Sequence, residues 1–317
     1  MIRLKVPLIP NENILNNLFD KNIFTVNDFL QKQSSDLQNI CKLQCKEITK
    51  LKDILTIKCS SSINGYELYL NRSIPNFVQT GIHKLDNLLG GGLMSSNIYE
   101  FCGPSSCGKT QLNYSILLNI IMNTKRDIIY IDSRKKFSVN RIKQILKNKY
   151  HLTNQDIYGI LKKLFVYSVS DIYCCITCLH SLKNKTEPII FIDSLPAIYL
   201  SFVGFLKNDG LCYLNHICSV LKYLCKRNAI IVVTNLAVKN CSPITNNVNE
   251  EVHYNQCTNQ LDFKPAIGKY WFHVPNTRLM FTTILKNKQQ ICIHISKSAY
   301  LSLNENCILQ IDDCGVS

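Results

Sequence analysis

"GPSSCGKTQ", residues 103–111, is the stretch that decides the fold of this chain. Gly103, Gly108, Lys109 and Thr110 occupy the fixed places of the pattern G-x-x-x-x-G-K-[ST], which describes a loop that wraps phosphate groups. The short apolar run "NIYEFC" precedes the loop, and the helix-like stretch "LNYSILLNIIMN" follows it. A chance match to so short a pattern is the alternative. The strand-before, helix-after context disfavours it and indicates a nucleoside triphosphate site.

In a loop of this form the backbone N–H groups surround the phosphates, and the positive end of the following helix points at them. Lys109 is expected to reach the β- and γ-phosphates of ATP, and the Thr110 hydroxyl to ligate Mg²⁺. Cys107 has two interpretations: a thiol with a lowered pKa near the helix terminus, or a residue at a permissive position. The nucleotide-binding residues expected in the loop are Gly103, Pro104, Ser105, Ser106, Cys107, Gly108, Lys109, Thr110 and Gln111.

A P-loop enzyme also needs an acidic residue, usually at the end of another buried strand. Asp193 in "PIIFIDS" follows four apolar residues and is expected to hold Mg²⁺ through water. Asp132 in "DIIYIDS" has the same form and is the rival candidate.

From Thr80 onward, apolar runs alternate with helical patterns, which predicts an α/β domain with a mainly parallel sheet flanked by helices. A final group of short apolar runs has no long helices between them and predicts an antiparallel extension of the sheet. The expected strands are 98–102, 128–132, 164–168, 189–193 and 230–235, and the expected helices are 109–123, 139–147, 172–182 and 212–226.

The first 58 residues predict a small helical domain. The stretches "NENILNNLF", "TVNDFLQ", "SDLQNICK" and "KEITKLKDIL" place apolar residues three and four apart, and Thr25 is a candidate helix N-cap. Ser60 to Gln79 breaks this period with Ser, Asn, Gly and Pro. The predicted division is a helical domain over 1–58, a linker over 59–79 and an ATPase domain over 80–317.

Composition narrows the class of protein. The 317 residues are 46% hydrophobic, enough for one substantial core and a small second domain. No run reaches about 18 consecutive apolar residues, so we expect a soluble intracellular chain. The sixteen cysteines are scattered through apparent core segments, which favours reduced thiols. Cys174, Cys175 and Cys178 form a C-x-x-C without a second ligand pair at a convincing spacing, so zinc is disfavoured.

The formal net charge is +14, and it is unevenly spread. Residues 121–165 hold eleven Lys or Arg residues against Asp127, Asp132 and Asp156, a net charge of +8. This excess fits a polyanion or an acidic partner. Solvated lysines in a chain rich in Asn, Ile and Lys are the equal alternative.

Four phrases together resemble the RecA-like recombinases of eukaryotes and archaea, the RecA/Rad-type recombinase family. They are "TGIHKLDNLLGGGL", "GKTQ", "IIFIDS" and "IIVVTN". The likeness covers nearly the whole chain and implies a RecA-like P-loop ATPase core behind a small helical domain, with Asp193 rather than Asp132 as the acidic residue. "NGYELY", "DSRKK" and "KPAIGKYWFHVPNTR" resemble one DNA-repair paralogue of the family more than its main strand-exchange recombinase.

Two departures from the family pattern concern hydrolysis. Active recombinases place a water-polarising Glu two residues after the Asp of the strand equivalent to "IIYIDS", and this chain has Arg134 there. A guanidinium cannot act as the general base. The family's strand equivalent to "VVTN" ends in a Gln that couples the γ-phosphate to DNA, and this chain has Leu236. We therefore expect ATP binding with weakened hydrolysis.

Further residues gain expected roles from the resemblance. His273 falls where the recombinases keep a histidine that reaches ATP across a subunit interface, although a packed or solvated histidine is the alternative. The DNA-facing loops correspond to 200–210 and 237–263. Only Lys207 and Lys239 supply cations there, beside Glu250 and Glu251, so phosphate neutralisation is modest. The loop aromatics Phe202, Phe205 and Tyr254 either stack on bases or pack within the protein.

The resemblance implies a nuclear, ATP- and Mg²⁺-binding paralogue in homologous recombination and double-strand break repair. It would bind single-stranded or branched DNA and assemble with related paralogues. Tyr66 and Tyr69 are candidate anchors for adding a strand to a neighbour's sheet, or they pack on their own core. The alternatives for the whole chain are an autonomous DNA-dependent ATPase or strand-exchange motor, a P-loop kinase for a small metabolite, and a scaffold that never hydrolyses its nucleotide.

Overall fold

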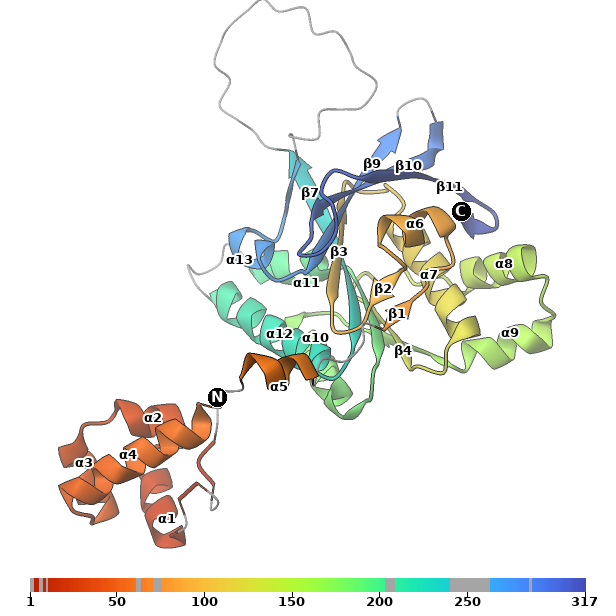
Figure 1. Ribbon diagram of the computed structural model, residues 1–317. Helices are drawn as coiled ribbons and strands as arrows, with labels where there is room; N and C mark the ends of the chain where they lie inside the picture. The colour runs from red at the N-terminus through yellow and green to blue at the C-terminus, as the bar shows by residue number, and fades with distance from the viewer. Residues whose placement is uncertain are drawn as a thin grey trace, which may run out of the picture. The chain divides into compact units, whose positions relative to one another are not determined.

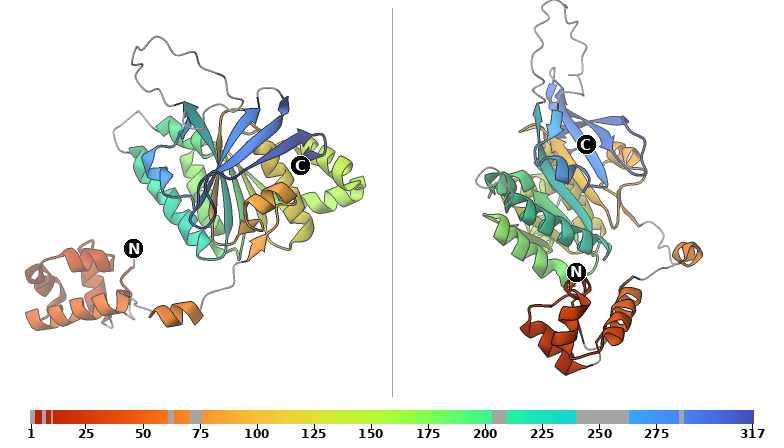
Figure 2. Two further views of the ribbon diagram at one scale, coloured as in Figure 1. Left: turned by 45° about the horizontal axis from the view of Figure 1, so that its top comes forward. Right: turned by 90° about the vertical axis from the view of Figure 1, so that its left-hand side faces the viewer.

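The computed structural model describes residues 3–5, 8–9, 11–60, 64–70, 76–202, 209–239, 263–284 and 287–317. The chain divides into two units, Met1–Ile74 and Pro75–Ser317. The domain boundaries at residues 58 and 80 stay a prediction from the sequence. Figures 1 and 2 show the ribbon from three sides.

The first unit is a small helical bundle, as the sequence predicted. Its helices are α1 (Glu12–Asp20), α2 (Val26–Gln31), α3 (Ser34–Cys41) and α4 (Cys45–Cys59). Thr25 caps α2, as expected: its side chain accepts the Asp28 N–H, and the Asp28 carboxylate accepts the Thr25 N–H. The bundle packs around fully buried apolar side chains, including Leu18, Phe29, Leu37, Ile48 and Leu55.

The segment predicted as a linker holds regular structure that the sequence reading missed. Helix α5 (Gly65–Leu70) lies within it, and the Asn64 side chain accepts the Glu67 N–H at the start of this helix, 2.8 Å away. Strand β1 (Phe77–Val78) pairs antiparallel with β2 (Leu93–Met94). Tyr66 and Tyr69 lie on α5 and are 71% and 70% exposed. They are therefore helical residues here and not part of an extended strand.

Within the described residues, the second unit is built on a ten-stranded sheet whose central strands are parallel. The order is β12-β11-β10-β9-β3-β7-β6-β4-β5, and β8 pairs with β7 outside this path. The parallel strands are β3 (Ile98–Gly103), β4 (Ile128–Asp132), β5 (Leu164–Ser168), β6 (Ile189–Asp193) and β7 (Ile230–Lys239). The five predicted strands are confirmed, with β7 extending four residues further.

Antiparallel strands extend the sheet beyond β3, as the sequence predicted (Figure 2). Strand β9 joins β3 in parallel, and the strands that follow it turn back antiparallel. These strands are β9 (Thr277–Ile284), β10 (Asn287–Lys297), β11 (Asn306–Asp312) and β12 (Gly315–Val316). Strand β8 (Phe263–Pro265) instead pairs antiparallel with β7, on the other side of β3.

Helices cover both faces of the parallel strands (Figure 1). Residues alternate along each strand: Ile128 and Tyr130 of β4 join one buried cluster with α7, α8 and α9, whereas Ile129 and Ile131 join another with α10 and α12. The helices are α6 (His83–Leu88), α7 (Lys109–Asn123), α8 (Val139–Tyr150), α9 (Asn154–Leu161), α10 (Ile172–Ser181), α11 (Leu195–Tyr199), α12 (Asp209–Cys225) and α13 (Lys269–Phe272), with 3₁₀ turns at Leu182–Asn184 and Leu200–Phe202.

A buried carboxylate joins the parallel part of the sheet to its antiparallel part. Glu100 of β3 is 0% exposed and forms an ion pair with Arg278 of β9. Its Oε1 also accepts the Asn235 Nδ2–H of β7 at 2.6 Å and the Trp271 Nε1–H of α13 at 2.9 Å. One side chain therefore connects three strands and a helix.

Arg278→Met should strongly destabilise the protein, because it leaves the Glu100 carboxylate buried without its cation. Losing one partner of a buried pair costs about 3–5 kcal/mol. Urea unfolding followed by circular dichroism measures this loss. The matched double variant Glu100→Gln/Arg278→Met should be less destabilised, and equal unfolding midpoints for wild type and Arg278→Met would contradict the assignment.

Candidate nucleotide-binding site

The P-loop connects the end of β3 at Gly103 to the start of α7 at Lys109. Gly108 is the residue before α7 and has φ +90°, a conformation that side-chain-bearing residues rarely adopt. A Cβ at Gly108 would lie 2.7 Å from Ile311 Cδ1, and one at Gly103 would lie 2.7 Å from Cys107 Sγ. Both positions therefore require glycine for this path of the loop.

The Lys109 side chain turns back into the loop. Its Nζ donates hydrogen bonds to the Gly103 carbonyl at 2.8 Å and to the Pro104 carbonyl at 2.6 Å, and the residue is 8% exposed. It also donates to Cys107 Sγ at 3.4 Å. Burial nevertheless raises the pKa of the Cys107 thiol, so the hypothesis of a lowered pKa is wrong. Cys107 is a neutral packing residue beneath the loop.

Three hydroxyl groups converge on the Asp193 carboxylate at the end of β6. Thr110 Oγ1 and Tyr130 O–H donate to its Oδ2 at 2.6 and 2.7 Å, and Thr234 Oγ1 donates to its Oδ1 at 2.7 Å. Burial, and the negative charge of Asp193, hold the pKa of Tyr130 well above its usual range. The phenol is therefore a fixed neutral donor. Carboxylate and hydroxyl oxygens are ligand types that suit Mg²⁺, so Thr110 and Asp193 fit this ion.

Asp132 has a different role from Asp193. It lies beside Asp193 in the register of β4 and β6. Its Oδ1 accepts the Arg134 N–H at 3.0 Å, and its Oδ2 accepts the Phe137 N–H at 2.8 Å. Both oxygens thus hold the loop after β4. The geometry favours Asp193 as the acidic residue of the nucleotide site.

The residues that depart from the recombinase pattern lie near this edge of the sheet. The Arg134 side chain is exposed on the loop after β4. Leu236 of β7 pairs with Gly103 of β3, so it lies next to the start of the P-loop. Its half-buried side chain offers no hydrogen-bonding group. The Gln111 side chain on α7 contacts α8, since its Oε1 accepts the Arg141 Nε–H at 2.8 Å.

His273 is the residue that follows α13, and its side chain is exposed. Its ring contacts Phe272 edge to face, with centroids 5.4 Å apart. A hollow of about 390 Å³ lies beside it, lined by Val238, Lys264, Pro265, Ala266, Gly268, Lys269, Phe272 and His273. The ring is therefore solvated rather than packed in the core, and it is accessible to another molecule. Its role across a subunit interface stays a prediction.

Most of the predicted DNA-facing positions fall outside the described residues. These are Phe205, Lys207, Glu250, Glu251, Tyr254 and the side chain of Lys239. Phe202 is described, and it makes edge-on ring contacts with Tyr173 and Tyr213. The packing interpretation therefore applies to Phe202.

The cysteine cluster lies on α10, as expected. Cys174 is exposed, whereas Cys175 and Cys178 face the core. Burial raises the pKa of Cys175 to about 12 and that of Cys178 to about 11. Cys175 and Cys178 are therefore neutral thiols packed in the core. Across the described part of the chain, no helix has the length and apolar character needed to span a membrane.

Comparison of the sequence with models of protein families shows the family of this chain. The family model described as Rad51 matches residues 72–317. The chain belongs to the Rad51 family. This confirms the recombinase resemblance that the sequence motifs indicated.

Several curated relatives of this Rad51-family chain are named as DNA repair proteins. DNA repair protein RAD51 homolog 4 of Bos taurus is 25% identical over 291 residues, which cover 87% of this chain and 84% of the relative. Probable DNA repair protein RAD51 homolog 4 of Dictyostelium discoideum is 26% identical, covering 90% of each chain. DNA repair protein RAD51 homolog 2 of Homo sapiens is 24% identical, covering 95% of this chain and 87% of the relative. Homolog 4, or Rad fifty-one D, is the paralogue that the three sequence features resemble.

A solved structure confirms the RecA-like fold. The crystal structure of the RadB recombinase matches with a TM-score of 0.59 at 19% sequence identity, over 76% of this chain and 98% of that one. At this identity the likeness concerns the fold alone.

Sequence reasoning missed Tyr130 and Thr234, the two further hydroxyl donors to Asp193. Both lie in apolar strands, Tyr130 two residues before Asp132 and Thr234 one residue before Asn235. A hydroxyl in a fully buried strand needs a hydrogen-bond partner, and that was the available signal. The identity of the partner depends on the strand order β7-β6-β4, which the sequence alone does not determine.

Lys109→Ala should weaken ATP binding at least several-fold while leaving the fold intact, because it removes the ammonium group of the loop and keeps the apolar strands. Binding of a fluorescent ATP analogue, together with thermal unfolding, measures both effects. Lys147→Ala, an exposed lysine on α8, is the control. Equal nucleotide affinity for Lys109→Ala and wild type would count against the site.

Proposed function

We propose that this chain is an ATP-binding Rad51-family paralogue that acts in homologous recombination and DNA double-strand break repair. It binds single-stranded DNA and assembles with related paralogues in the nucleus. The relatives named DNA repair protein RAD51 homolog 4 and homolog 2 support the process. The observation that carries the nucleotide part is the 2.6 Å hydrogen bond between Thr110 of the P-loop and Asp193 of β6.

In this proposal, residues 103–111 bind the triphosphate through backbone N–H groups and the Lys109 ammonium. Thr110 and Asp193 would hold Mg²⁺, the latter through water. When bound, the ion neutralises phosphate charge. Tyr130 and Thr234 keep the Asp193 carboxylate in place through their hydrogen bonds.

The chain hydrolyses ATP slowly at most, and this weak activity depends on DNA. Arg134 replaces the carboxylate that would polarise water, and a guanidinium has no acceptor atom. Leu236 beside Gly103 has no group that can sense a phosphate. The nucleotide therefore serves mainly to order the site and its contacts with neighbouring subunits.

Exposed residues offer contacts for such neighbours. Tyr66 and Tyr69 on α5 are amphipathic aromatics of the kind enriched at protein interfaces. The accessible ring of His273 is free to contact a nucleotide held by an adjacent subunit. An autonomous ATPase motor remains the alternative function if a partner donates the missing catalytic groups, whereas family membership gives the kinase alternative no support.

Purification of the tagged chain from its own cells tests the assembly. We expect other Rad51-family paralogues among the co-purifying proteins, identified by mass spectrometry, and reduced recovery with Tyr66→Ser/Tyr69→Ser. Tyr158→Ser, which removes an exposed tyrosine on α9, is the control. Absence of any paralogue from the purified material would argue against the proposed function.

Arg134→Glu should accelerate ATP hydrolysis, because it restores a carboxylate on the loop after β4. General-base positioning is worth about 10²- to 10⁴-fold, so partial restoration is measurable. Single-turnover hydrolysis at saturating ATP is the measurement, since it removes affinity from the comparison. Arg134→Gln is the control that removes the charge without adding a base.

Two results would contradict this account. Fast hydrolysis by the wild-type chain without partners would show that the site is not weakened. A loss of ATP binding in both Arg134 variants, with no gain in rate, would show that Arg134 contacts the nucleotide.

A further inference from the structure

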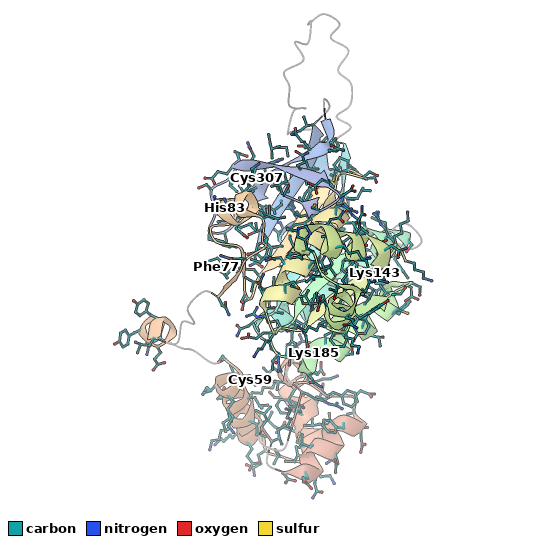
Figure 3. The ribbon with its side chains drawn as sticks, turned by 90° about the vertical axis from the view of Figure 1, so that its right-hand side faces the viewer. Cys59, Phe77, His83, Lys143, Lys185 and Cys307 are labelled. Atoms are coloured by element: carbon teal, nitrogen blue, oxygen red, sulfur yellow. The ribbon has the colours of Figure 1, made fainter. Side chains whose placement is uncertain are left out.

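The edge of the parallel sheet opposite the P-loop carries many basic side chains. Strands β5, β4, β6 and β7 are parallel neighbours, so the connections that precede them meet at one edge. These connections are 162–163, 124–127, 182–188 and 226–229. They contain the residues that we call the basic edge: Lys125, Arg126, Lys162, Lys163, Lys183, Lys185, Lys226 and Arg227. Figure 3 labels Lys185 of this group and Lys143 of α8, which lies apart from it.

The positive charge of the basic edge exceeds the negative partial charge of the helix C-termini that meet there. The same connections contain two acidic residues, Asp127 and Glu187, which leaves a net charge of +6. Helices α7, α9, α10 and α12 end at this edge. Each helix C-terminus is equivalent to roughly −0.5 charge, about −2 in total. The helix ends therefore leave most of this positive charge unbalanced.

The two acidic residues already have cationic partners. Arg126 pairs with Glu187 at 3.0 Å, and Lys185 pairs with Asp127 at 2.8 Å. The other basic-edge residues with exposed side chains form no ion pair within the described ranges. They are Lys125, Lys162, Lys163, Lys226 and Arg227.

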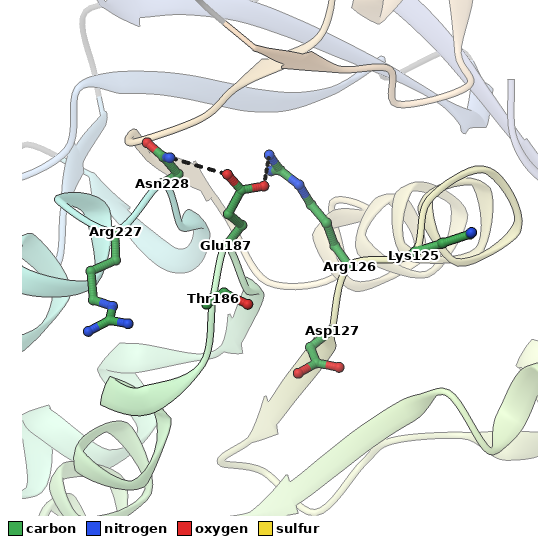
Figure 4. Close-up of a pocket in the computed structure, with 7 residues that line it drawn as sticks. All are labelled: Lys125, Arg126, Asp127, Thr186, Glu187, Arg227 and Asn228. Carbon is green, nitrogen blue, oxygen red and sulfur yellow. Dashed lines mark hydrogen bonds and ion pairs between the residues drawn. The ribbon is translucent and has the colours of Figure 1, made fainter. Parts of the chain in front are cut away.

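A hollow of about 650 Å³ lies in this edge (Figure 4). Its lining residues are Lys125, Arg126, Asp127, Thr186, Glu187, Arg227 and Asn228. In Figure 4, Glu187 lies between Arg126 and Asn228, and the Asn228 amide donates to it at 3.2 Å. Lys125 and Arg227 extend away from Glu187 on opposite sides. The paired residues thus form a fixed polar lining, and the two unpaired cations flank it.

We propose that the basic edge binds the phosphodiester backbone of DNA. The identity of the ligand rests on the proposed function in DNA repair, but the surface is separate from the nucleotide site. Neighbouring β-strands of the sheet lie about 4.8 Å apart, so the four connections that precede them extend over about 14 Å. One DNA strand carries a charge every ~3.4 Å along a duplex, so this length faces about four phosphates. A row of separate cations suits such a repeating anion.

Two exposed aromatic rings accompany these cations. Lys185 Nζ lies 4.8 Å from the centre of the Phe165 ring, and Lys183 Nζ lies 5.5 Å from the centre of the Tyr223 ring. Phe165 and Tyr223 are 41% and 43% exposed. Aromatic rings between cations provide stacking surfaces for unpaired bases. We therefore expect single-stranded DNA to bind more tightly than duplex.

The test uses the full-length chain and the double variant Lys125→Glu/Arg227→Glu. Binding of fluorescein-labelled single-stranded and duplex oligonucleotides is measured by anisotropy across a salt titration. Phosphate contacts contribute about 0.7 each to the salt slope for single strands, so the slope should fall by about 1.4. Affinity should fall roughly tenfold at 0.1 M salt. The separate variant Lys162→Glu/Lys163→Glu should act in the same direction.

Lys143→Glu/Lys147→Glu on α8 is the control, because it changes the net charge equally away from the basic edge. DNA affinity and salt slope should change less in this control, and ATP binding should be normal in all three variants. If the wild-type chain did not bind ATP, the proposed function would be contradicted, but the DNA-binding test would be unaffected. Wild-type DNA affinity in both basic-edge variants would overturn the inference. Loss of paralogue binding at unchanged DNA affinity would also overturn it, since the edge would then be a protein-binding surface.

Discussion

The buried Glu100 carboxylate is the interaction on which the second unit depends most. It receives hydrogen bonds from β7 and α13 and pairs with Arg278 of β9, in a region without exposure to water. Three residues later the same strand ends at Gly103, where the P-loop begins. A buried charge tolerates few alternative arrangements, because each lost partner leaves the carboxylate unsatisfied. Glu100 therefore fixes the position of β3, and with it the start of the nucleotide loop, relative to Leu236 of β7 and the segment that leads to His273.

Asp193 provides a comparable constraint at the carboxyl edge. Its three hydroxyl donors come from α7, β4 and β7, so the carboxylate joins the P-loop helix to two neighbouring strands. In the proposed function, this geometry would account for nucleotide binding beside weakened hydrolysis at Arg134 and Leu236. The binding residues belong to the packed centre of the sheet, whereas Arg134 lies on an exposed loop. Substitution of such a loop residue changes chemistry at little cost in stability.

The sequence predicted the parallel sheet well because its strands are continuous apolar runs that end in recognisable residues, as "IIYIDS" and "IIFIDS" do. Without the resemblance to the recombinase family, the sequence could not show which of Asp132 and Asp193 is the acidic residue of the site. The difference lies in which neighbouring groups hydrogen-bond to each carboxylate. The sequence reading missed α5, since a helix of only six residues capped by Asn64 carries almost no periodic signal. Cys107 was ambiguous for a related reason: its pKa depends on burial by tertiary packing as well as on the helix terminus beside it. Local pattern thus predicted the elements, and tertiary contacts determined the chemistry of individual groups.

The length of the central strands has a consequence for how two anionic ligands would influence each other. Strand β4 contains five residues, Ile128–Asp132, and therefore separates the P-loop edge from the basic edge by about 16 Å. This distance exceeds the Debye length of about 8 Å at physiological ionic strength. Charges at the two edges would then be largely screened from each other, so a triphosphate at one edge would not repel a DNA backbone at the opposite edge. At 0.01 M salt, where the Debye length is about 30 Å, the two ligands would become mutually antagonistic.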